Sequence, residues 1–284
     1  MSSGIQPGFA YNIAGLVSKL SNCFERRMDA QAAQFYSELV RRGFDPEAHV
    51  DVLPEQRLVY VCVPKCASTT IKMALSAMVG RNATSFEHLH KRRYSGLRSP
   101  AHVGLSTFHR VVTSPHTLRF SFVRNPYERL VSAWADKFQN KPLIPGDSFV
   151  DKYLSGRAGV DRSLPVGADQ ALSFADFVTF ACATADQRVD AHWAVQDSVL
   201  CMPGITLDFV GKVETFTTDF ARVVDHAGAG DRIRAIGSTH IHPSAHQPWP
   251  HYYTQALAER VYRAYERDFE RFAYPRRLHE RACA

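Results

Sequence analysis

One segment of the chain combines a cation, hydroxyl groups and a predicted helix start. In residues 57–72 (RLVYVCVPKCASTTIK), an apolar run predicts a strand buried on both faces, and a polar loop follows it. The loop places Lys65 ahead of Ser68, Thr69 and Thr70. Backbone N–H groups at a helix start have no partner inside the helix and lie at the positive end of its dipole. The segment therefore predicts an anion site with its own lysine.

A second segment repeats this order. Residues 118–134 (LRFSFVRNPYERLVSAW) predict a strand, a turn and a helix, in which Asn125 is a favourable N-cap and Pro126 suits the first helical position. Arg124 ends the strand and offers a planar fork that matches a phosphate. Two anion sites on one sheet, each with its own cation, predict a ligand that is phosphorylated at two places.

The first loop differs from the P-loop of nucleoside triphosphate enzymes. That motif needs glycines for close backbone approach and carries its lysine late, just before a hydroxyl that binds Mg²⁺. Here the loop has no glycine, the lysine comes first, and no obvious Asp follows the second strand to hold a metal. We therefore expect a grip on a smaller anionic group without a metal. A helix that is merely capped by Ser68 or Thr69 is the structural alternative, but it does not explain Lys65.

Together, VPKCASTTIK and VRNPYERLVSAW resemble the paired signatures of the sulfotransferases, and are most similar to the Golgi carbohydrate type, sulfotransferase family 2. The similarity covers most of the chain after about residue 57, including the block HWAVQDSVLCMPGITLDFVGKVETF from His192 and a C-terminal pattern that ends at Tyr274. The resemblance implies an α/β fold with a central parallel sheet flanked by helices and a P-loop-like nucleotide site.

The resemblance also implies the donor 3′-phosphoadenosine 5′-phosphosulfate (PAPS) and a sulfuryl transfer to an acceptor hydroxyl or amine. The first loop would hold the 5′-phosphosulfate, while Arg124 and Ser132, eight residues apart, would hold the 3′-phosphate. An ordinary ion pair for Arg124 and a helix-surface role for Ser132 are the alternatives. The residues expected to bind the donor are Lys65, Cys66, Ala67, Ser68, Thr69, Thr70, Arg124 and Ser132.

Transfer to a hydroxyl also needs a base, and histidine has a suitable pKa. We expect residues 80–114, which are polar and rich in histidine, to form loops and short elements over a cleft. The candidate bases between the two loops are His88, His90, His102, His109 and His116. His102 lies 22 residues before Arg124, where the resemblance to heparan-type 2-O-sulfotransferases implies the catalytic histidine. We predict that His102 is the base and that Lys65 stabilises the leaving group. Glu87 is the alternative base.

The acceptor pocket is predicted near His192 and Trp193, because a flat aromatic ring suits the face of a sugar. A core position for Trp193 is an equal alternative. The resemblance favours a carbohydrate or a glycosylated molecule as acceptor, while the sulfated position stays open. The rival functions are a metal-dependent small-molecule kinase and a non-enzymatic module that binds RNA or a phosphorylated ligand.

The remaining patterns predict how these residues are positioned. Apolar spacing predicts a helix over 28–42 that ends at Gly43, and other helices over 174–183 and 254–272. A third strand is predicted at 207–213, and residues 141–165 read as a surface excursion. Strands that alternate with helices predict a parallel sheet. We expect one domain over 1–284, with a helical extension over 1–50 and a catalytic core over 57–274.

Composition limits the partners and the location. A net charge of +6 and a pI near 9.0 predict anionic ligands, but the basic run at 90–94 more often marks a solvated loop than a nucleic-acid site. No apolar run reaches the roughly 18–20 residues of a membrane span, and the apolar stretch from Phe9 makes a poor signal peptide. The six cysteines include no CxxC pair. We therefore expect a cytoplasmic protein with reduced thiols, without bound nucleic acid.

Overall fold

A four-stranded sheet organises the first half of the molecule. The computed structural model describes residues 28–83, 85–161, 163–167, 171–187, 189–237 and 247–276. The strands lie in the order β1 (Val50–Leu53), β2 (Leu58–Val61), β3 (Leu118–Val123) and β4 (Phe209–Lys212). Strands β2, β3 and β4 are parallel, whereas β1 runs antiparallel to β2. The predicted α/β class and three predicted strands are confirmed, but the sheet is not wholly parallel.

Strand β1 was not predicted, because a charged residue interrupts its short apolar run. Asp51 is 2 % exposed in a strand whose residues are all buried. Its carboxylate accepts a hydrogen bond from Arg92 at 2.9 Å and lies 3.7 Å from the Lys72 ammonium. Both cations come from distant segments, so the sequence around Asp51 gives no sign that its charge is compensated.

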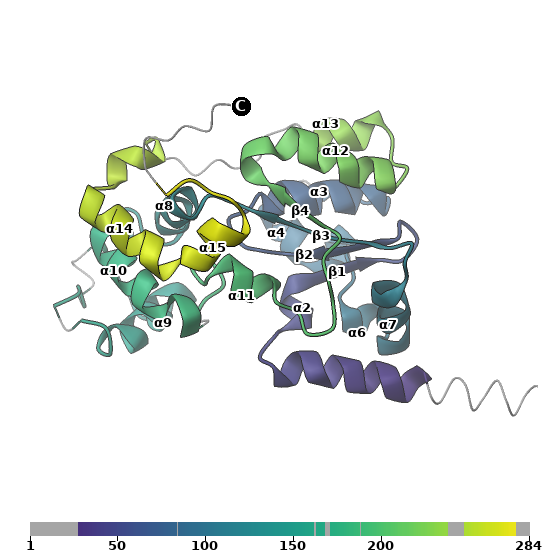
Figure 1. Ribbon diagram of the computed structural model, residues 1–284, viewed down its shortest axis with the longest axis horizontal. Coiled ribbons are helices and arrows are strands. Elements are labelled where there is room, and N and C mark those ends of the chain that lie inside the picture. The colour runs from purple at the N-terminus through teal and green to yellow at the C-terminus, as the bar shows by residue number, and fades with distance from the viewer. Residues whose placement is uncertain are drawn as a thin grey trace, which may run out of the picture.

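Helices cover both faces of the sheet (Figure 1). One face carries α3 (Ser68–Met78), α12 (Phe216–His226) and α13 (Asp231–Gly237), and α4 (Phe86–His90) and α5 (Arg92–Ser95) lie beside α3. The other face carries α2 (Pro46–His49), α6 (Pro100–Val103), α7 (Leu105–Thr113) and a helix over 28–41. Gly43 follows the end of that last helix, and its φ of 76° matches the predicted C-cap.

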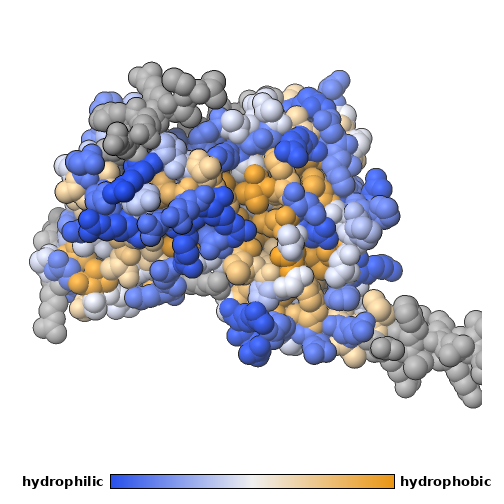
Figure 2. Space-filling model, in the orientation of Figure 1, coloured by the Kyte–Doolittle hydropathy of each residue, from blue (hydrophilic) through white to orange (hydrophobic). Residues whose placement is uncertain are grey.

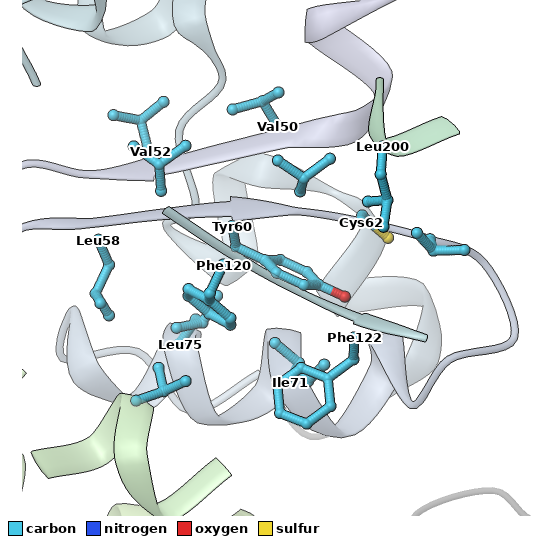
Figure 3. Close-up of a cluster of buried hydrophobic side chains, with 14 of the residues drawn as sticks. Val50, Val52, Leu58, Tyr60, Cys62, Ile71, Leu75, Phe120, Phe122 and Leu200 are labelled. Atoms are coloured by element: carbon cyan, nitrogen blue, oxygen red, sulfur yellow. The ribbon is translucent and has the colours of Figure 1, made fainter. Parts of the chain in front are cut away.

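Aromatic side chains of the strands pack onto α3. Figure 3 shows Tyr60, Phe120 and Phe122 pointing from β2 and β3 toward Ile71 and Leu75. The rings of Tyr60 and Phe120 stack with centroids 5.2 Å apart, and all five side chains are fully buried. This packing fixes the start of α3 relative to the end of β2.

A second hydrophobic core surrounds α8 (Pro126–Lys137), which directly follows β3. Asn125 caps α8 by accepting a hydrogen bond from the Tyr127 N–H at 3.0 Å, as predicted. The predicted apolar stripe is buried: Tyr127, Leu130, Val131, Trp134 and Phe138. The other helices of this half are α9 (Ser148–Arg157), α10 (Phe174–Thr184), α11 (Gln196–Leu200), α14 (Gln255–Ala264) and α15 (Glu266–Arg271). Short 3₁₀ turns lie before α11 at Ala185–Gln187 and before α14 at Trp249–Tyr252, and a third, at Val213–Thr215, joins β4 to α12.

Two predicted elements differ from the structure. The single helix expected over 254–272 is divided at Tyr265, whose φ of −116° and ψ of 21° leave helical geometry. The Tyr265 hydroxyl donates to the Trp193 carbonyl at 2.5 Å, a contact between segments that local sequence does not encode. The excursion expected over 141–165 contains α9, which buries Val150 and Tyr153.

Hydrophobic and hydrophilic residues occupy different parts of the molecular surface. Figure 2 shows hydrophobic residues near the middle of one face, over the strands, with hydrophilic residues on either side. In the part of the chain that the structure describes, no helix combines the length and hydrophobicity that a membrane crossing requires. Cys62, Cys66, Cys182 and Cys201 carry free thiols.

The packing of β3 against β4 leaves no room for a side chain at Gly211. An added Cβ would lie 2.5 Å from Cε1 of Phe122, whose buried ring is itself packed against Phe216 at 5.0 Å. We expect Gly211→Ala to lower the free energy of unfolding by about 1–3 kcal/mol in urea denaturation. Gly230→Ala is the matched control, because nothing lies within 4 Å of its added Cβ. Equal stability of the two variants would contradict this packing argument.

Candidate functional site

A cavity of about 1160 Å³ lies where the two halves meet. Its walls come from the segments 43–49, 62–72, 124–137, 189–199 and 213–214. Because β2 and β3 are parallel neighbours, the loops that follow them emerge at the same edge of the sheet. Both predicted cationic loops therefore reach one cavity.

The first loop bends without glycine. Lys65 and Ala67 adopt left-handed φ values of 67° and 56°, which cost residues with a Cβ about 1–2 kcal/mol each. Helix α3 begins at Ser68 with Ala67 as its N-cap, and no side chain caps it. The structure therefore shows no capping of α3 by Ser68 or Thr69, the feature on which the structural alternative was based. Lys65 and residues 67–70 line the cavity at this end, and the unpaired N–H groups of a helix start can bind anions.

The predicted cation of the first loop has an acidic partner that the sequence did not reveal. The Lys65 ammonium donates to Asp136 Oδ2 at 2.9 Å, and Lys137 lies 3.0 Å from the same oxygen. Burial raises the pKa of the Asp136 carboxyl, but the two lysines outweigh it and lower that pKa to about 2. Burial also lowers the pKa of Lys65, against the opposing effect of Asp136. Lys65 and Asp136 therefore form a charged ion pair in the lining of the cavity.

Arg124, the cation of the second loop, is also paired with a carboxylate. Arg124 Nη2 donates to Glu128 at 2.7 Å, and Nη1 donates to the Lys65 carbonyl at 3.4 Å. The Nε of Arg124 is buried with no partner among the described residues. Ser132 lies two turns along α8, is buried and lines the same cavity. The structure thus brings together Arg124, Ser132 and Lys65, which were predicted to act on one ligand.

Cys66 takes a different position from its neighbours in the loop. Its thiol is fully buried, does not line the cavity and donates to Gln196 Oε1 at 3.2 Å. Burial raises the pKa of this thiol to about 12. The same Gln196 oxygen accepts from the Arg124 N–H at 2.9 Å. Only the backbone of Cys66 can serve a ligand, while its side chain links the two loops through Gln196.

A buried arginine that the sequence analysis missed ties the cavity walls together. Arg129 is 1 % exposed, and its guanidinium donates to three carbonyls: Pro64 at 3.2 Å, Ala194 at 2.8 Å and Ala191 at 2.5 Å. The first lies just before Lys65, and the other two flank His192. No local signal distinguishes Arg129 from a surface arginine of α8, because all its partners are distant in the chain.

His192 reaches the cavity, but Trp193 does not. His192 lines the cavity, with its Nδ1 2.6 Å from Asp190 Oδ1. Trp193 is fully buried in the core around α8, with its ring centroid 5.9 Å from that of Phe177 and 6.0 Å from that of Phe180. The prediction that Trp193 lines an acceptor pocket is therefore wrong, and its core alternative is confirmed.

The structure does not bring His102 to the cavity. His102 is exposed on α6, and its Nδ1 lies 2.6 Å from Ser99 Oγ. Helices α4 to α7 pack beside α3 and against β1, so none of the described residues in 80–114 lines the cavity, and the predicted cover is wrong. Glu87, His88, His109 and His116 also lie outside the cavity. His49, which the sequence analysis did not consider, lines it instead.

The chemistry of the site follows from these placements. Two cations and a helix start converge on one cavity, and a histidine paired with a carboxylate lies on its wall. No group of three or more His, Cys, Asp or Glu side chains arranged for a metal occurs among the residues that the structure describes. The arrangement can bind a ligand with two anionic groups and remove a proton beside it.

Comparison with known proteins agrees with this geometry. A sulfotransferase family model matches residues 48–275. Carbohydrate sulfotransferase 14 from Homo sapiens is 28% identical over 235 residues, which cover 80% of this chain and 60% of the relative. Carbohydrate sulfotransferase 8 from Mus musculus is 30% identical over 223 residues, covering 72% and 50%. The chain thus spans about 60% or less of the length of these relatives. No solved structure matches it significantly.

Proposed function

The chain belongs to the sulfotransferase family, and from this premise we propose that it moves a sulfuryl group from PAPS to a hydroxyl or amine of a carbohydrate acceptor. One observation carries the proposal: two cationic loops, at the ends of neighbouring parallel strands, face one cavity. PAPS carries a phosphosulfate and a separate 3′-phosphate, so it has the two anionic groups that such a site requires. The names of the relatives favour a carbohydrate as acceptor.

The first loop and the start of α3 would hold the phosphosulfate in a P-loop-like manner. The N–H groups of residues 66–70 would donate hydrogen bonds to its oxygens, and the Lys65 ammonium would bind the donor in place of Asp136. Arg124 and Ser132 would hold the 3′-phosphate, with Arg124 exchanging Glu128 for it. The cavity is larger than a typical small-molecule pocket of about 300–1,000 Å³, so it has space for part of an acceptor as well.

The proposed reaction is an in-line transfer within this cavity. The acceptor oxygen attacks sulfur as the bond from sulfur to the bridging oxygen breaks, and negative charge develops on the departing phosphate. Lys65 and the backbone N–H groups stabilise that charge in place, which is commonly the largest contribution to catalysis of this kind. No metal is needed for these steps.

Incubation with labelled PAPS and a panel of glycans tests the proposal. We expect label in at least one glycan, at a rate that a chelator leaves unchanged. A requirement for Mg²⁺ and ATP instead would favour the kinase alternative. Retention of all label on the donor, with every acceptor class and with cell extracts, would reject the transferase function.

Arg124 provides a separate test of the donor site. We expect Arg124→Ala to weaken binding of 3′,5′-ADP by about 10–100-fold, because a hydrogen bond between charged groups contributes about 1.5–3 kcal/mol. Binding of 5′-AMP, which lacks the 3′-phosphate, should change far less. Calorimetry with both nucleotides measures the difference, and Arg98→Ala, an exposed arginine outside the cavity, is the control. A wild type that does not distinguish the two nucleotides would remove Arg124 from this role.

A further inference from the structure

We propose that His192 is the base that removes the acceptor proton and that Asp190 orients it. The inference rests on the proposed sulfuryl transfer and names the residue that the transfer requires. It replaces the prediction from sequence, which placed the base at His102.

The contacts of Asp190 fix the proton on one ring nitrogen of His192. Asp190 Oδ1 lies 2.6 Å from Nδ1 of the ring and accepts the His192 backbone N–H at 2.8 Å, while Lys152 donates to Oδ2. Burial raises the pKa of the Asp190 carboxyl, but His192 and Lys152 outweigh it and hold that pKa below its ordinary value. Asp190 is therefore an anion that accepts a hydrogen bond from Nδ1–H. The other nitrogen, Nε2, is left as the acceptor.

The surroundings keep the imidazole neutral at physiological pH. Burial lowers the pKa of His192, Asp190 opposes this effect, and the nearby positive charges of Lys137 and Lys65 lower the pKa further. Lys152 pairs with Asp190 through the other carboxylate oxygen, Oδ2. The net pKa lies below the ordinary value, so the ring can accept a proton near pH 7.

His192 is also close to the place where the sulfuryl group would be transferred. Both His192 and Lys65 line the cavity, and the charge of Lys65 acts on the imidazole. The ring packs edge-on against Phe149, with centroids 5.0 Å apart, which holds its orientation. Arg129 supports both sides by binding the carbonyls before Lys65 and on either side of His192.

Each of the other candidate histidines whose side chain the structure describes either lies outside the cavity or lacks a carboxylate partner. His102 does not line the cavity. His49 does, but its Nδ1 contacts the Cys62 carbonyl at 3.1 Å and has no carboxylate to stabilise a charged ring. Among the described residues, His49 and His192 are the histidines that line the cavity, and only His192 is paired with a carboxylate.

The proposed step moves one proton and one sulfuryl group. The acceptor oxygen forms a bond to sulfur while its proton passes to Nε2 of His192. The bond between sulfur and the bridging oxygen breaks, and its electron pair leaves with the phosphate of 3′,5′-ADP beside Lys65. The imidazolium, stabilised by Asp190, then returns its proton to water.

Two substitutions test this role in the full-length protein. We expect His192→Ala to lower the rate of transfer by at least about 10²-fold while 3′,5′-ADP binding changes little. Asp190→Asn should lower the rate and move the acidic limb of the pH–rate profile to lower pH, because removing the anion removes the interaction that raises the pKa of His192. His116→Ala, an exposed histidine outside the cavity, is the control.

The outcomes separate this inference from the proposed function. If the wild type neither binds 3′,5′-ADP nor labels any acceptor, the proposed function fails. If the wild type is active and His192→Ala retains more than half of its rate, or if the loss appears in His49→Ala or His102→Ala instead, His192 is not the base. Should His192→Ala fail to fold, an unmoved acidic limb in Asp190→Asn would overturn the assignment.

Discussion

Replacing Lys65 with alanine is expected to lower the turnover of sulfuryl transfer by about 10²–10³-fold. The reason is geometric: Lys65 follows β2 directly, is held in a left-handed backbone conformation and points its ammonium into the cavity beside Asp136. A positive charge fixed there before the reaction stabilises charge that appears on the departing phosphate. Initial rates at saturating donor and acceptor measure the effect.

The control for Lys65 is a lysine with a similar ion pair outside the cavity. Lys91 is exposed and pairs with Glu87 on the neighbouring turn, so Lys91→Ala should leave the rate within about twofold, because exposed ion pairs contribute little. Calorimetry with 3′,5′-ADP shows whether the Lys65 variant still binds nucleotide. A variant that binds nucleotide normally and turns over at more than one fifth of the wild-type rate would contradict the role of Lys65.

Replacing Arg129 with methionine is expected to lower the free energy of unfolding by at least about 3 kcal/mol. Methionine fills the volume but leaves the carbonyls of Pro64, Ala191 and Ala194 without their donors, and each buried unpaired group costs about 1–3 kcal/mol. Urea denaturation followed by circular dichroism measures the loss. Transfer activity should also fall, since the same carbonyls border Lys65 and His192.

A surface arginine provides the matched comparison for Arg129. Arg263 is exposed on α14 and pairs with Glu259 at 3.2 Å, so Arg263→Met should change stability by less than about 1 kcal/mol. Arg129→Lys retains the charge and N–H donors but not the planar fork, so it should recover part of the loss. A loss below about 1 kcal/mol in Arg129→Met would mean that the three carbonyls find other partners and that Arg129 does not hold the walls.

Local signals were sufficient to predict the strand–loop–helix units. The apolar run of β3, the N-cap Asn125 and the proline at the first position of α8 all act within a few residues, and each was predicted correctly. The buried stripe of α8 followed from helical spacing in the same way. Strand β1 was missed because the compensation of Asp51 comes from Lys72 and Arg92, which are far away in the sequence.

The donor side of the site was more predictable than the acceptor side. Lys65 and Arg124 follow buried strands, so parallel pairing brings them together once the strands are recognised. Which histidine joins them depends on how α6 and the 189–199 segment pack, and spacing along the chain does not determine that packing. The Asp190–His192 spacing was a usable signal, because an acidic residue two positions away can bind the backbone N–H and the ring together.

The paired charges of the cavity have a consequence for the choice of ligand. Lys65 is occupied by Asp136 and Arg124 by Glu128, so an incoming anion must compete with a carboxylate that is already in place. A simple phosphate or 5′-AMP can displace one of them and gains little from the exchange. A nucleotide with anions at both ends displaces both at once. On the proposed function, the internal carboxylates would thereby favour a nucleotide with two anionic groups over a monophosphate.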